Sequence, residues 1–386
     1  MKKIGILTLV TQGGSNYGGL LQCLALQNVL CDLGYDVSVI NFMSTEATSV
    51  FHKIICRLSS LDGLCDFCGL IKDVFLDSAG ILSLKKGEKN KELLEYFEKY
   101  RSENLRLTPR VNESNIGNVC CDYDVIIVGS DQVWSGFTKD KLVYLCDWYP
   151  VYAGKRISYA ACSSRPRVPQ IKYAKISRLM KRMDGISVRD NQTANIVKKV
   201  CNIDAVQVLD PVFLYDFNHL INDSLSYVEE PYILFYVLGP EISGGYEKML
   251  KLLKAQLGDM KIIAIQLRDH NAKIAKYADV VLSSCLINDW ITLIAKARFV
   301  VTDSFHGLCF SLKYRRPFIA FYTAAWRASR LLDMKDRFSL DMIVVSSVND
   351  MVQKSSLSFE IDYNVIEQKI KRGREFSLQY LINAIE

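Results

Sequence analysis

Short apolar runs alternate with amphipathic segments along most of the chain, which is the pattern of strands followed by helices. In the segment 19–34, Leu26, Val29, Leu30 and Leu33 recur at helical spacing, and Gly34 ends the helix. The first half of the chain predicts strands at 3–10, 36–42, 123–134, 156–161, 185–190 and 205–211, and helices at 19–34, 168–182 and 190–199. Residues 50–120 are less regular and predict a helical insertion.

A second series of the same kind follows residues 213–230, which break the period and have the polarity of a linker. It predicts strands at 231–239, 261–267, 278–284, 299–301 and 317–322, and helices at 245–257, 287–296 and 305–312. The last segment, 363–385, places its apolar residues on one helical face and therefore predicts a helix that packs on the rest of the chain.

Strands that alternate with helices favour an α/β fold, with parallel sheets covered on both faces. Two series joined by one linker predict two doubly wound, Rossmann-like domains that face a cleft. We expect an N-terminal domain at 1–215, which includes the insertion at 50–120, and a C-terminal domain at 231–350. Residues 351–386 form a C-terminal helical segment that packs back on the first domain.

Ligands of doubly wound sheets bind beyond the carboxyl ends of the strands, so the polar residues at predicted strand ends are the candidate site. The segment "GGSNYGGLLQ" at 13–22 follows the first strand, and its glycines would let a ligand approach the backbone closely. It lacks the spacing of GxGxxG and of the P-loop, so a dinucleotide site is not supported. Asn16 either binds a polar ligand or holds the turn, with Tyr17 and Gly18 beside it.

The segment "VGSDQVW" at 128–134 ends a buried strand. Asp131 is either a helix cap or a carboxylate that accepts a proton from a sugar hydroxyl. Trp134 either stacks on a pyranose face or fills the core.

Cationic residues follow later strands. Arg189 ends the segment "SVRD", and a guanidinium suits a carboxylate or a phosphate. Arg330, near the start of a helix, could reach the same anion. His306 lies in "TDSFHG", in the first turn of a helix that follows a strand, where Ser304 can cap and Gly307 follows. The helix N-terminus favours an anion at this place.

Composition narrows the class of protein. The chain has 386 residues, of which 49% are hydrophobic and 23% charged, as in soluble globular enzymes. No apolar stretch approaches the roughly 18 residues needed to span a bilayer. The apolar run after "MKK" is short and lacks a cleavage pattern, so we interpret it as a strand and expect a cytoplasmic protein.

Metal binding is not expected. The 12 cysteines are spread along the chain, mostly in apolar contexts, and favour buried thiols. The segment "CDFC" at 65–68 has no second ligand pair nearby, whereas a zinc site needs about four ligands.

The positive charge is concentrated. Residues 155–189 contain ten Lys or Arg and one acid, Asp184, while the whole chain has a net charge of +6. This stretch is either a solvated helix face or a surface that meets phosphates of a substrate or of anionic lipid; in the second case Lys172, Lys175 and Lys181 would contact the lipid. We expect no nucleic-acid partner.

Taken in order, the motifs resemble the polysaccharide pyruvyl transferase family. The likeness runs from "NYGGLLQCLALQNVL" through "VGSDQVW", "ISYAACSS", "ISVRD" and "VLDPVFL" to "VTDSFHGLCFSLKYRRPFIAF" and "SRLLDM". It implies a GT-B-like fold, with an N-terminal acceptor domain and a C-terminal donor domain. It also implies transfer of a pyruvyl group from phosphoenolpyruvate to a sugar of a capsular, exopolysaccharide or cell-wall glycan or its lipid-linked precursor. The product is a cyclic ketal, phosphate is released, and no cofactor is needed.

The resemblance implies roles for the site residues. His306 and Asp131 would be catalytic; Arg189, Arg330, Ser304 and Gly307 would bind the donor; and Asn16, Tyr17, Gly18 and Trp134 would bind the acceptor. Some members of the family have an arginine where this chain has Ser304, so either another residue, with Arg330 as the candidate, supplies that cation or the donor is bound more weakly or differently. The acceptor, when lipid-linked, would place the protein peripherally at the inner face of the membrane.

Two other functions use the same features. A GT-B glycosyltransferase would bind the diphosphate of a sugar nucleotide in the same basic surroundings. A non-catalytic saccharide-binding module would be expected to lack His306 or Arg189, and both residues are present.

Overall fold

A computed structural model describes residues 1–11, 14–45, 91–135, 137, 139, 141–225, 228–267, 273–323, 328–355 and 361–386. The segment "CDFC" and the first part of the expected insertion, including the helix-like stretch at 51–60, lie outside the described residues. Within them the chain divides into two compact units. The first unit contains the described residues before Asn90, Glu98–Leu214 and Phe376–Glu386, and the second contains Asn90–Phe97 and Tyr215–Glu375.

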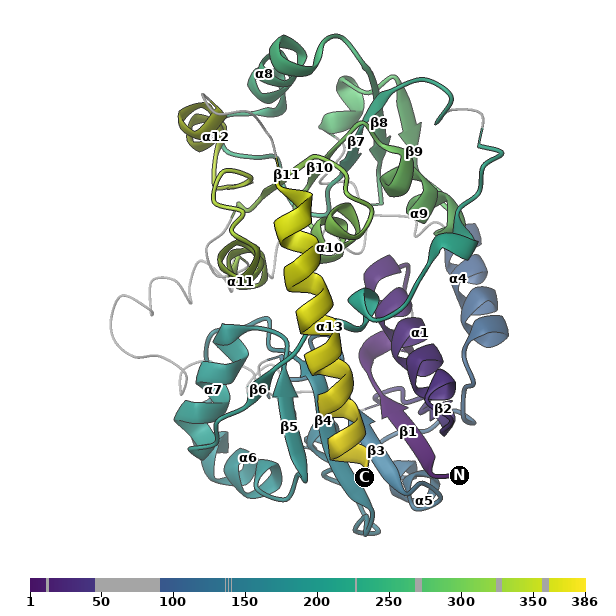
Figure 1. The fold of residues 1–386 in the computed structure, drawn as a ribbon. Helices are drawn as coiled ribbons and strands as arrows, with labels where there is room; N and C mark the ends of the chain where they lie inside the picture. The colour runs from purple at the N-terminus through teal and green to yellow at the C-terminus, as the bar shows by residue number, and fades with distance from the viewer. Residues whose placement is uncertain are drawn as a thin grey trace. The chain divides into compact units, whose positions relative to one another are not determined.

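The first unit is built on a six-stranded parallel sheet in the order β2-β1-β3-β4-β5-β6 (Figure 1). Its strands are β1 (Lys3–Leu7), β2 (Asp36–Val39), β3 (Val125–Val128), β4 (Lys155–Ala161), β5 (Gly185–Val188) and β6 (Val206–Gln207). Its helices include α1 (Tyr17–Asp32), α5 (Ile116–Cys120), α6 (Tyr173–Met180) and α7 (Asn191–Cys201), and α4 (Lys91–Asn104) has residues in both units.

The second unit repeats the plan with a six-stranded sheet in the order β12-β11-β10-β7-β8-β9, again parallel throughout. Its strands are β7 (Tyr232–Tyr236), β8 (Lys261–Ile265), β9 (Val280–Leu282), β10 (Phe299–Thr302), β11 (Phe318–Phe321) and β12 (Val344–Val345). Its helices are α8 (Tyr246–Leu257), α9 (Ile287–Lys296), α10 (Phe305–Lys313), α11 (Ser329–Phe338), α12 (Val348–Ser355) and the first part of α13 (Tyr363–Ile385).

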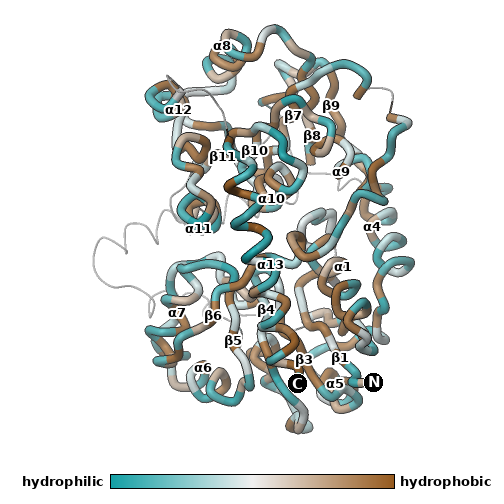
Figure 2. Tube along the Cα trace, in the orientation of Figure 1, coloured by the Kyte–Doolittle hydropathy of each residue, from teal (hydrophilic) through white to brown (hydrophobic). Residues whose placement is uncertain are grey.

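These strands form where both faces of a sheet are covered. The strand β3 has the sequence "VIIV" and is buried at every position, as expected of a central parallel strand. Figure 2 shows the hydrophobic colour concentrated on strands such as β1 and β3. Two helices of the first unit begin with side-chain caps: Asn16 accepts a hydrogen bond from the Gly19 amide before α1, and Asp190 accepts one from the Thr193 amide before α7.

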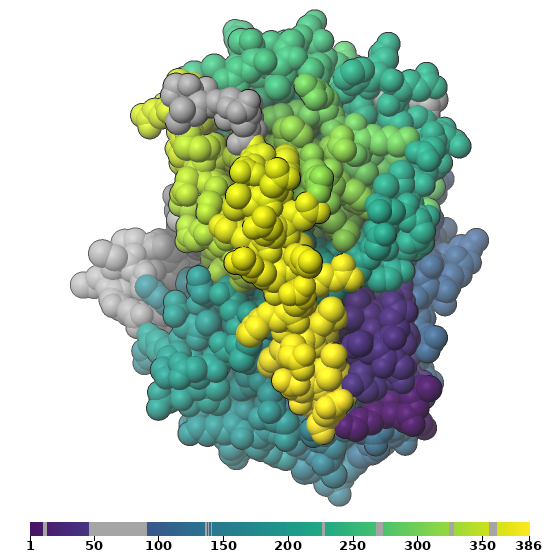
Figure 3. All heavy atoms as spheres, in the orientation of Figure 1, coloured from purple at the N-terminus to yellow at the C-terminus, as the bar shows by residue number. Residues whose placement is uncertain are grey.

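The structure confirms the predicted fold class, with two doubly wound α/β units. It also confirms that the C-terminal helix packs on the first unit: the Tyr380 hydroxyl donates to the Ser158 carbonyl at 3.0 Å, and Leu381 is fully buried. The other side of α13 is open to solvent (Figure 3). The expected cleft between the domains stays a prediction. None of the helices among the described residues is long and apolar enough to cross a bilayer.

Candidate active site

The carboxyl ends of the strands in the first unit carry a buried ionic cluster, which we call the carboxylate cluster. It consists of Asp131 after β3, Arg189 after β5 and Asp210 after β6. Arg189 donates from Nη1 to Asp210 Oδ2 at 2.6 Å and from Nη2 to Asp131 Oδ1 at 3.3 Å. The guanidinium side chain is 2% exposed, so these charges interact away from bulk water.

Cys162, the residue after β4, completes the surroundings of Arg189. Its Sγ accepts a hydrogen bond from Arg189 Nη2 at 2.9 Å. Burial alone would lower the pKa of Arg189, but the Cys162 sulfur and the carboxylates of Asp210 and Asp131 raise that pKa well above its usual value. Arg189 therefore stays a cation, and it balances only one of the two carboxylates.

Hydrogen bonds extend the cluster toward the first strand. Ser130 Oγ donates to Asp210 Oδ2 at 3.2 Å, and Thr8 Oγ1 donates to the Ser130 carbonyl at 2.9 Å. Gln22 Nε2 donates to Thr8 Oγ1 at 3.2 Å. All three side chains are buried. Polar residues after β1, β3, β4, β5 and β6 thus meet at one edge of the sheet, as the rule of ligand sites at strand ends predicts.

The backbone holds Asp131 in an unusual conformation. Its φ is +71°, in the left-handed region that non-glycine residues seldom adopt. The Asp131 carbonyl accepts a hydrogen bond from the Cys162 amide at 3.0 Å, which ties the turn after β3 to the end of β4. Strain of this kind is found most often at functional sites.

The structure separates the expected acceptor residues. Asn16 is exposed and caps α1, where its Oδ1 accepts from the Gly19 amide at 3.0 Å. Tyr17 and Gly18 are buried in the first turn of α1. Trp134 is 1% exposed, and its indole N–H donates to the Tyr144 carbonyl at 2.9 Å. Of its two alternatives, the structure supports core filling, because neither face of the indole is open to a sugar.

In the second unit, the end of β10 and the start of α10 hold His306. Ser304 is the N-cap of α10 and its Oγ accepts from the Gly307 amide at 3.3 Å. Gly307 has no room for a side chain, because a Cβ there would lie 2.3 Å from Thr302 Oγ1. The structure thus gives Ser304 and Gly307 a role in positioning the helix that carries His306, and their donor contacts stay a prediction.

Arg330 and His306 each contact the ring of Phe305. The His306 and Phe305 rings make an edge-to-face contact at 5.1 Å between centroids. The Arg330 guanidinium carbon lies 5.9 Å from the centroid of Phe305. His306 is 7% exposed and Arg330 is half-buried. The expectation that Arg330 belongs with "TDSFHG" fits this geometry, and a meeting of His306 with Arg189 of the first unit stays a prediction.

Sequence reasoning missed three residues of these two sites. Asp210 and Cys162 contact Arg189, and Asp303 accepts hydrogen bonds from the amides of Leu238 and Gly239, both at 2.6 Å. Each of them directly follows or lies near the end of a predicted strand, so the rule that selected Asp131 and Arg189 could also have selected them.

Among the described residues, no group of three or more His, Cys, Asp or Glu side chains is arranged to hold a metal ion. The carboxylate cluster contains only two acids, and both already accept hydrogen bonds from Arg189.

Two solved structures illustrate the fold to which the chain is similar. The chain is similar to S. aureus MnaA in a co-structure with UDP, with 11% identity, 100% of this chain and 96% of that chain covered, and a TM-score of 0.51. It is also similar to a protein of Listeria monocytogenes that carries the name UDP-N-acetylglucosamine 2-epimerase, with 10% identity, 99% and 95% covered, and a TM-score of 0.53. At these identities the likeness shows the fold alone.

Comparison at the level of the family is more specific. No curated protein matches the chain. The family model described as polysaccharide pyruvyl transferase matches residues 16–324. This range begins at the Asn16 cap and contains both the carboxylate cluster and the segment with His306. The chain belongs to the polysaccharide pyruvyl transferase family.

Proposed function

We propose that the protein transfers a pyruvyl group from phosphoenolpyruvate to two hydroxyl groups of a sugar and forms a cyclic ketal. The observation that supports this most directly is the carboxylate cluster, at the strand ends of a chain that belongs to this family. The acceptor is a sugar of a surface or cell-wall glycan or of its lipid-linked precursor.

Asp131 acts in this proposal as the base that accepts a proton from the sugar hydroxyl. Its carboxylate is buried and oriented by Arg189, and the cluster has one carboxylate more than its cation can balance. A surplus of negative charge suits the hydroxyl groups of a sugar and disfavours a phosphate. We therefore assign the first unit to the acceptor, and we assign Arg189 to positioning Asp131 in place of the donor contact expected from the sequence.

The second unit binds the donor in this proposal. Phosphoenolpyruvate carries a phosphate and a carboxylate, and the start of α10 together with Arg330 offers a helix N-terminus and a guanidinium. His306 is in the first turn of α10, and its ring contacts Phe305, the residue that the Arg330 guanidinium also approaches. It is the residue placed to donate a proton to the methylene carbon of the donor.

The reaction then balances without a further reactant. His306 protonates C3 of phosphoenolpyruvate, C2 becomes electrophilic, and a sugar hydroxyl adds to it while Asp131 accepts the hydroxyl proton. The bond from C2 to the phosphate oxygen breaks, and a second sugar hydroxyl adds to C2 to close the ketal. The two sugar hydroxyls release two protons. One of them returns to His306, which gave a proton to the new methyl group, and the other leaves with the phosphate.

The donor can be identified by a binding measurement. Phosphoenolpyruvate at 100 times its Kd should raise the thermal unfolding midpoint by the equivalent of about 2.7 kcal/mol, since it binds only the folded protein. A sugar nucleotide at the same concentration is the control. A shift with the sugar nucleotide and none with phosphoenolpyruvate would favour the glycosyltransferase alternative.

The chemistry is tested by mass spectrometry of candidate acceptors after incubation with phosphoenolpyruvate, where the ketal appears as a pyruvyl addition with loss of water. His306→Gln should lower kcat by roughly 10²–10⁴-fold, the usual share of a positioned acid, and keep most of the donor affinity. Asn218→Ala, at an exposed position in the short 3-10 helix Asn218–Leu220 of the same unit, is the control. Normal turnover by His306→Gln would show that another group protonates the donor.

A further inference from the structure

One surface of the first unit is rich in exposed cationic residues, and we call it the basic face. It is formed by the outer sides of α6 and α7 and the segment before α6. Its exposed cationic residues are Arg165, Arg167, Arg178, Lys181, Arg182, Lys198 and Lys199. The exposed acids of the same segments are Asp184 and Asp204, which leaves an excess of five positive charges against a net charge of +6 for the whole chain.

Two lysines expected at this surface do not belong to it. Lys172 is 9% exposed and its Nζ donates to the Lys139 carbonyl at 3.3 Å. Lys175 forms an ion pair with Asp147 at 2.7 Å. Lys181 is exposed, as expected. The expectation is thus corrected for Lys172 and Lys175, because their ammonium groups bind partners within the first unit. The other cationic residues of the basic face would contact an anionic partner.

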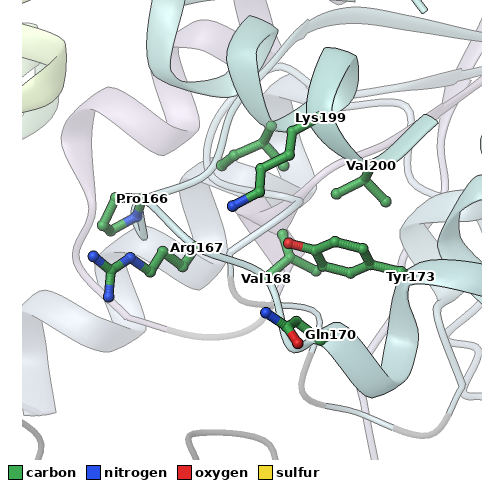
Figure 4. A pocket seen from close by; sticks show the side chains of 8 residues that line it. Pro166, Arg167, Val168, Gln170, Tyr173, Lys199 and Val200 are labelled. Carbon is green, nitrogen blue, oxygen red and sulfur yellow. The ribbon is translucent and has the colours of Figure 1, made fainter. Parts of the chain in front are cut away.

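The basic face also contains apolar surface. Ile171 is 56% exposed in the short helical turn before α6. Beside it lies a hollow lined by side chains from the segment before α6, from α6 and from α7 (Figure 4). Arg167, Lys199 and the Tyr173 ring are on its walls, and Val168 and Val200 contribute apolar surface. A hollow of this kind offers cations to a phosphate and apolar contacts to the carbon atoms next to it.

We propose that the basic face binds the anionic surface of a lipid bilayer. An excess of five charges attracts anionic headgroups, because each Lys or Arg near such a surface adds to the attraction. Ile171 would enter the interface, as apolar residues of peripheral proteins do. A nucleic acid fits this surface less well. An exposed aliphatic side chain gains nothing from contact with the phosphate backbone, and the bases of a nucleic acid are contacted mainly by aromatic side chains.

Sedimentation with vesicles tests this inference without donor or acceptor, so the result does not depend on the proposed reaction. The protein should bind vesicles of 70% phosphatidylcholine and 30% phosphatidylglycerol at 50 mM salt. It should bind pure phosphatidylcholine weakly and leave the anionic vesicles at 500 mM salt, where surface charges are screened. Replacing Arg178, Lys181 and Arg182 by Gln should weaken binding about 100-fold, at about fivefold for each cation.

The matched control replaces three exposed lysines of α8 in the second unit, Lys248, Lys251 and Lys254, by Gln. It lowers the net charge by the same amount and should change binding less than threefold. Ile171→Ser should weaken binding to the anionic vesicles severalfold at 50 mM salt, and Val365→Ser, which changes an exposed residue of α13, should not. Equal binding to neutral and anionic vesicles, equal loss by the two triple variants, or preferential binding of a DNA probe would overturn the proposal.

Discussion

Arg189 carries one positive charge between two buried carboxylates, and the proposed assignment of the first unit to the acceptor rests on this ratio. Its two terminal nitrogens are used for Asp210 and Asp131 at 2.6 and 3.3 Å. A guanidinium held in this way is a poor ligand for a further anion but a good support for a carboxylate that must keep its orientation. The charge of the cluster therefore favours a hydroxyl donor, as the proposed acceptor provides.

Removing this cation should cost much of the stability of the first unit. Arg189→Met leaves Asp131 and Asp210 buried without a counter-ion, and we expect the free energy of unfolding to fall by about 3–5 kcal/mol. Arg189→Met combined with Asp210→Asn should recover part of the loss, because one uncompensated charge is removed. Urea unfolding at pH 7 measures both effects.

The control for this prediction is Arg178→Met. Because Arg178 is exposed on α6, this substitution should change the free energy of unfolding by less than about 0.5 kcal/mol. A cost below about 1 kcal/mol for Arg189→Met would mean that the two carboxylates are already protonated or hydrated in solution. The cluster could not then supply the base that the reaction needs.

At the level of residues, the sequence could select candidate site residues but could not predict what their side chains contact. Asp131, Arg189 and His306 could be selected because they follow predicted strands, where doubly wound sheets bind ligands, and Arg330 because it is a cation near the start of a helix. The sequence could not show that Arg189 meets Asp210, since this contact depends on the order of strands in the sheet. The sequence also did not decide whether Trp134 stacks on a sugar or fills the core, because the packing around a ring depends on residues that are distant in the chain.

The start of α10 illustrates how an element determines the position of a functional side chain. Thr302 Oγ1 donates to the Tyr236 carbonyl at 2.7 Å and accepts from the Ser304 amide at 3.1 Å, so the end of β10 is tied to β7 and to the helix cap. Gly307 lets the helix approach Thr302 closely. The position of His306 follows from these contacts.

Gly307→Ala should therefore destabilise the second unit. An alanine would gain about 1 kcal/mol in helix propensity, but its Cβ would lie 2.3 Å from Thr302 Oγ1, and such overpacking costs about 1–3 kcal/mol. We expect a lower unfolding midpoint and a displaced His306. Gly373→Ala, in the half-exposed middle of α13, is the control and should be neutral or stabilising. A rise in stability for Gly307→Ala as well would contradict the close approach.

Helices and strands were the most predictable level of this molecule. Strands such as β3 are apolar at every position because parallel sheets are buried on both faces, and helices such as α7 begin at a capping residue and carry an apolar stripe. The two-residue strand β12 was not predicted, and the helix α12 was covered only by the general expectation of a helical segment at 351–386.

At the level of the whole molecule, the first unit is completed by residues from the far end of the chain. Ser377 accepts a hydrogen bond from the Leu209 amide at 3.0 Å, and the Lys2 ammonium donates to the Ile385 carbonyl at 2.8 Å. Leu381 and Ile385 are fully buried. The sheet that carries the carboxylate cluster therefore depends on residues 376–386. These residues belong to the first unit, although most of the second unit separates them in sequence from the rest of that unit.

This dependence predicts that a change in α13 weakens one unit and leaves the other intact. Leu381→Ala removes a fully buried side chain and should lower the free energy of unfolding of the first unit by about 2–5 kcal/mol. Hydrogen exchange read by peptide should become faster in β4 and β5 and stay unchanged in β7 and β8. The control is Gln379→Ala, which changes an exposed residue two positions before Leu381. It should leave hydrogen exchange in both units unchanged. Faster exchange in β7 and β8 as well would mean that the two units unfold together, whereas no change in β4 and β5 would mean that α13 is not part of the first core.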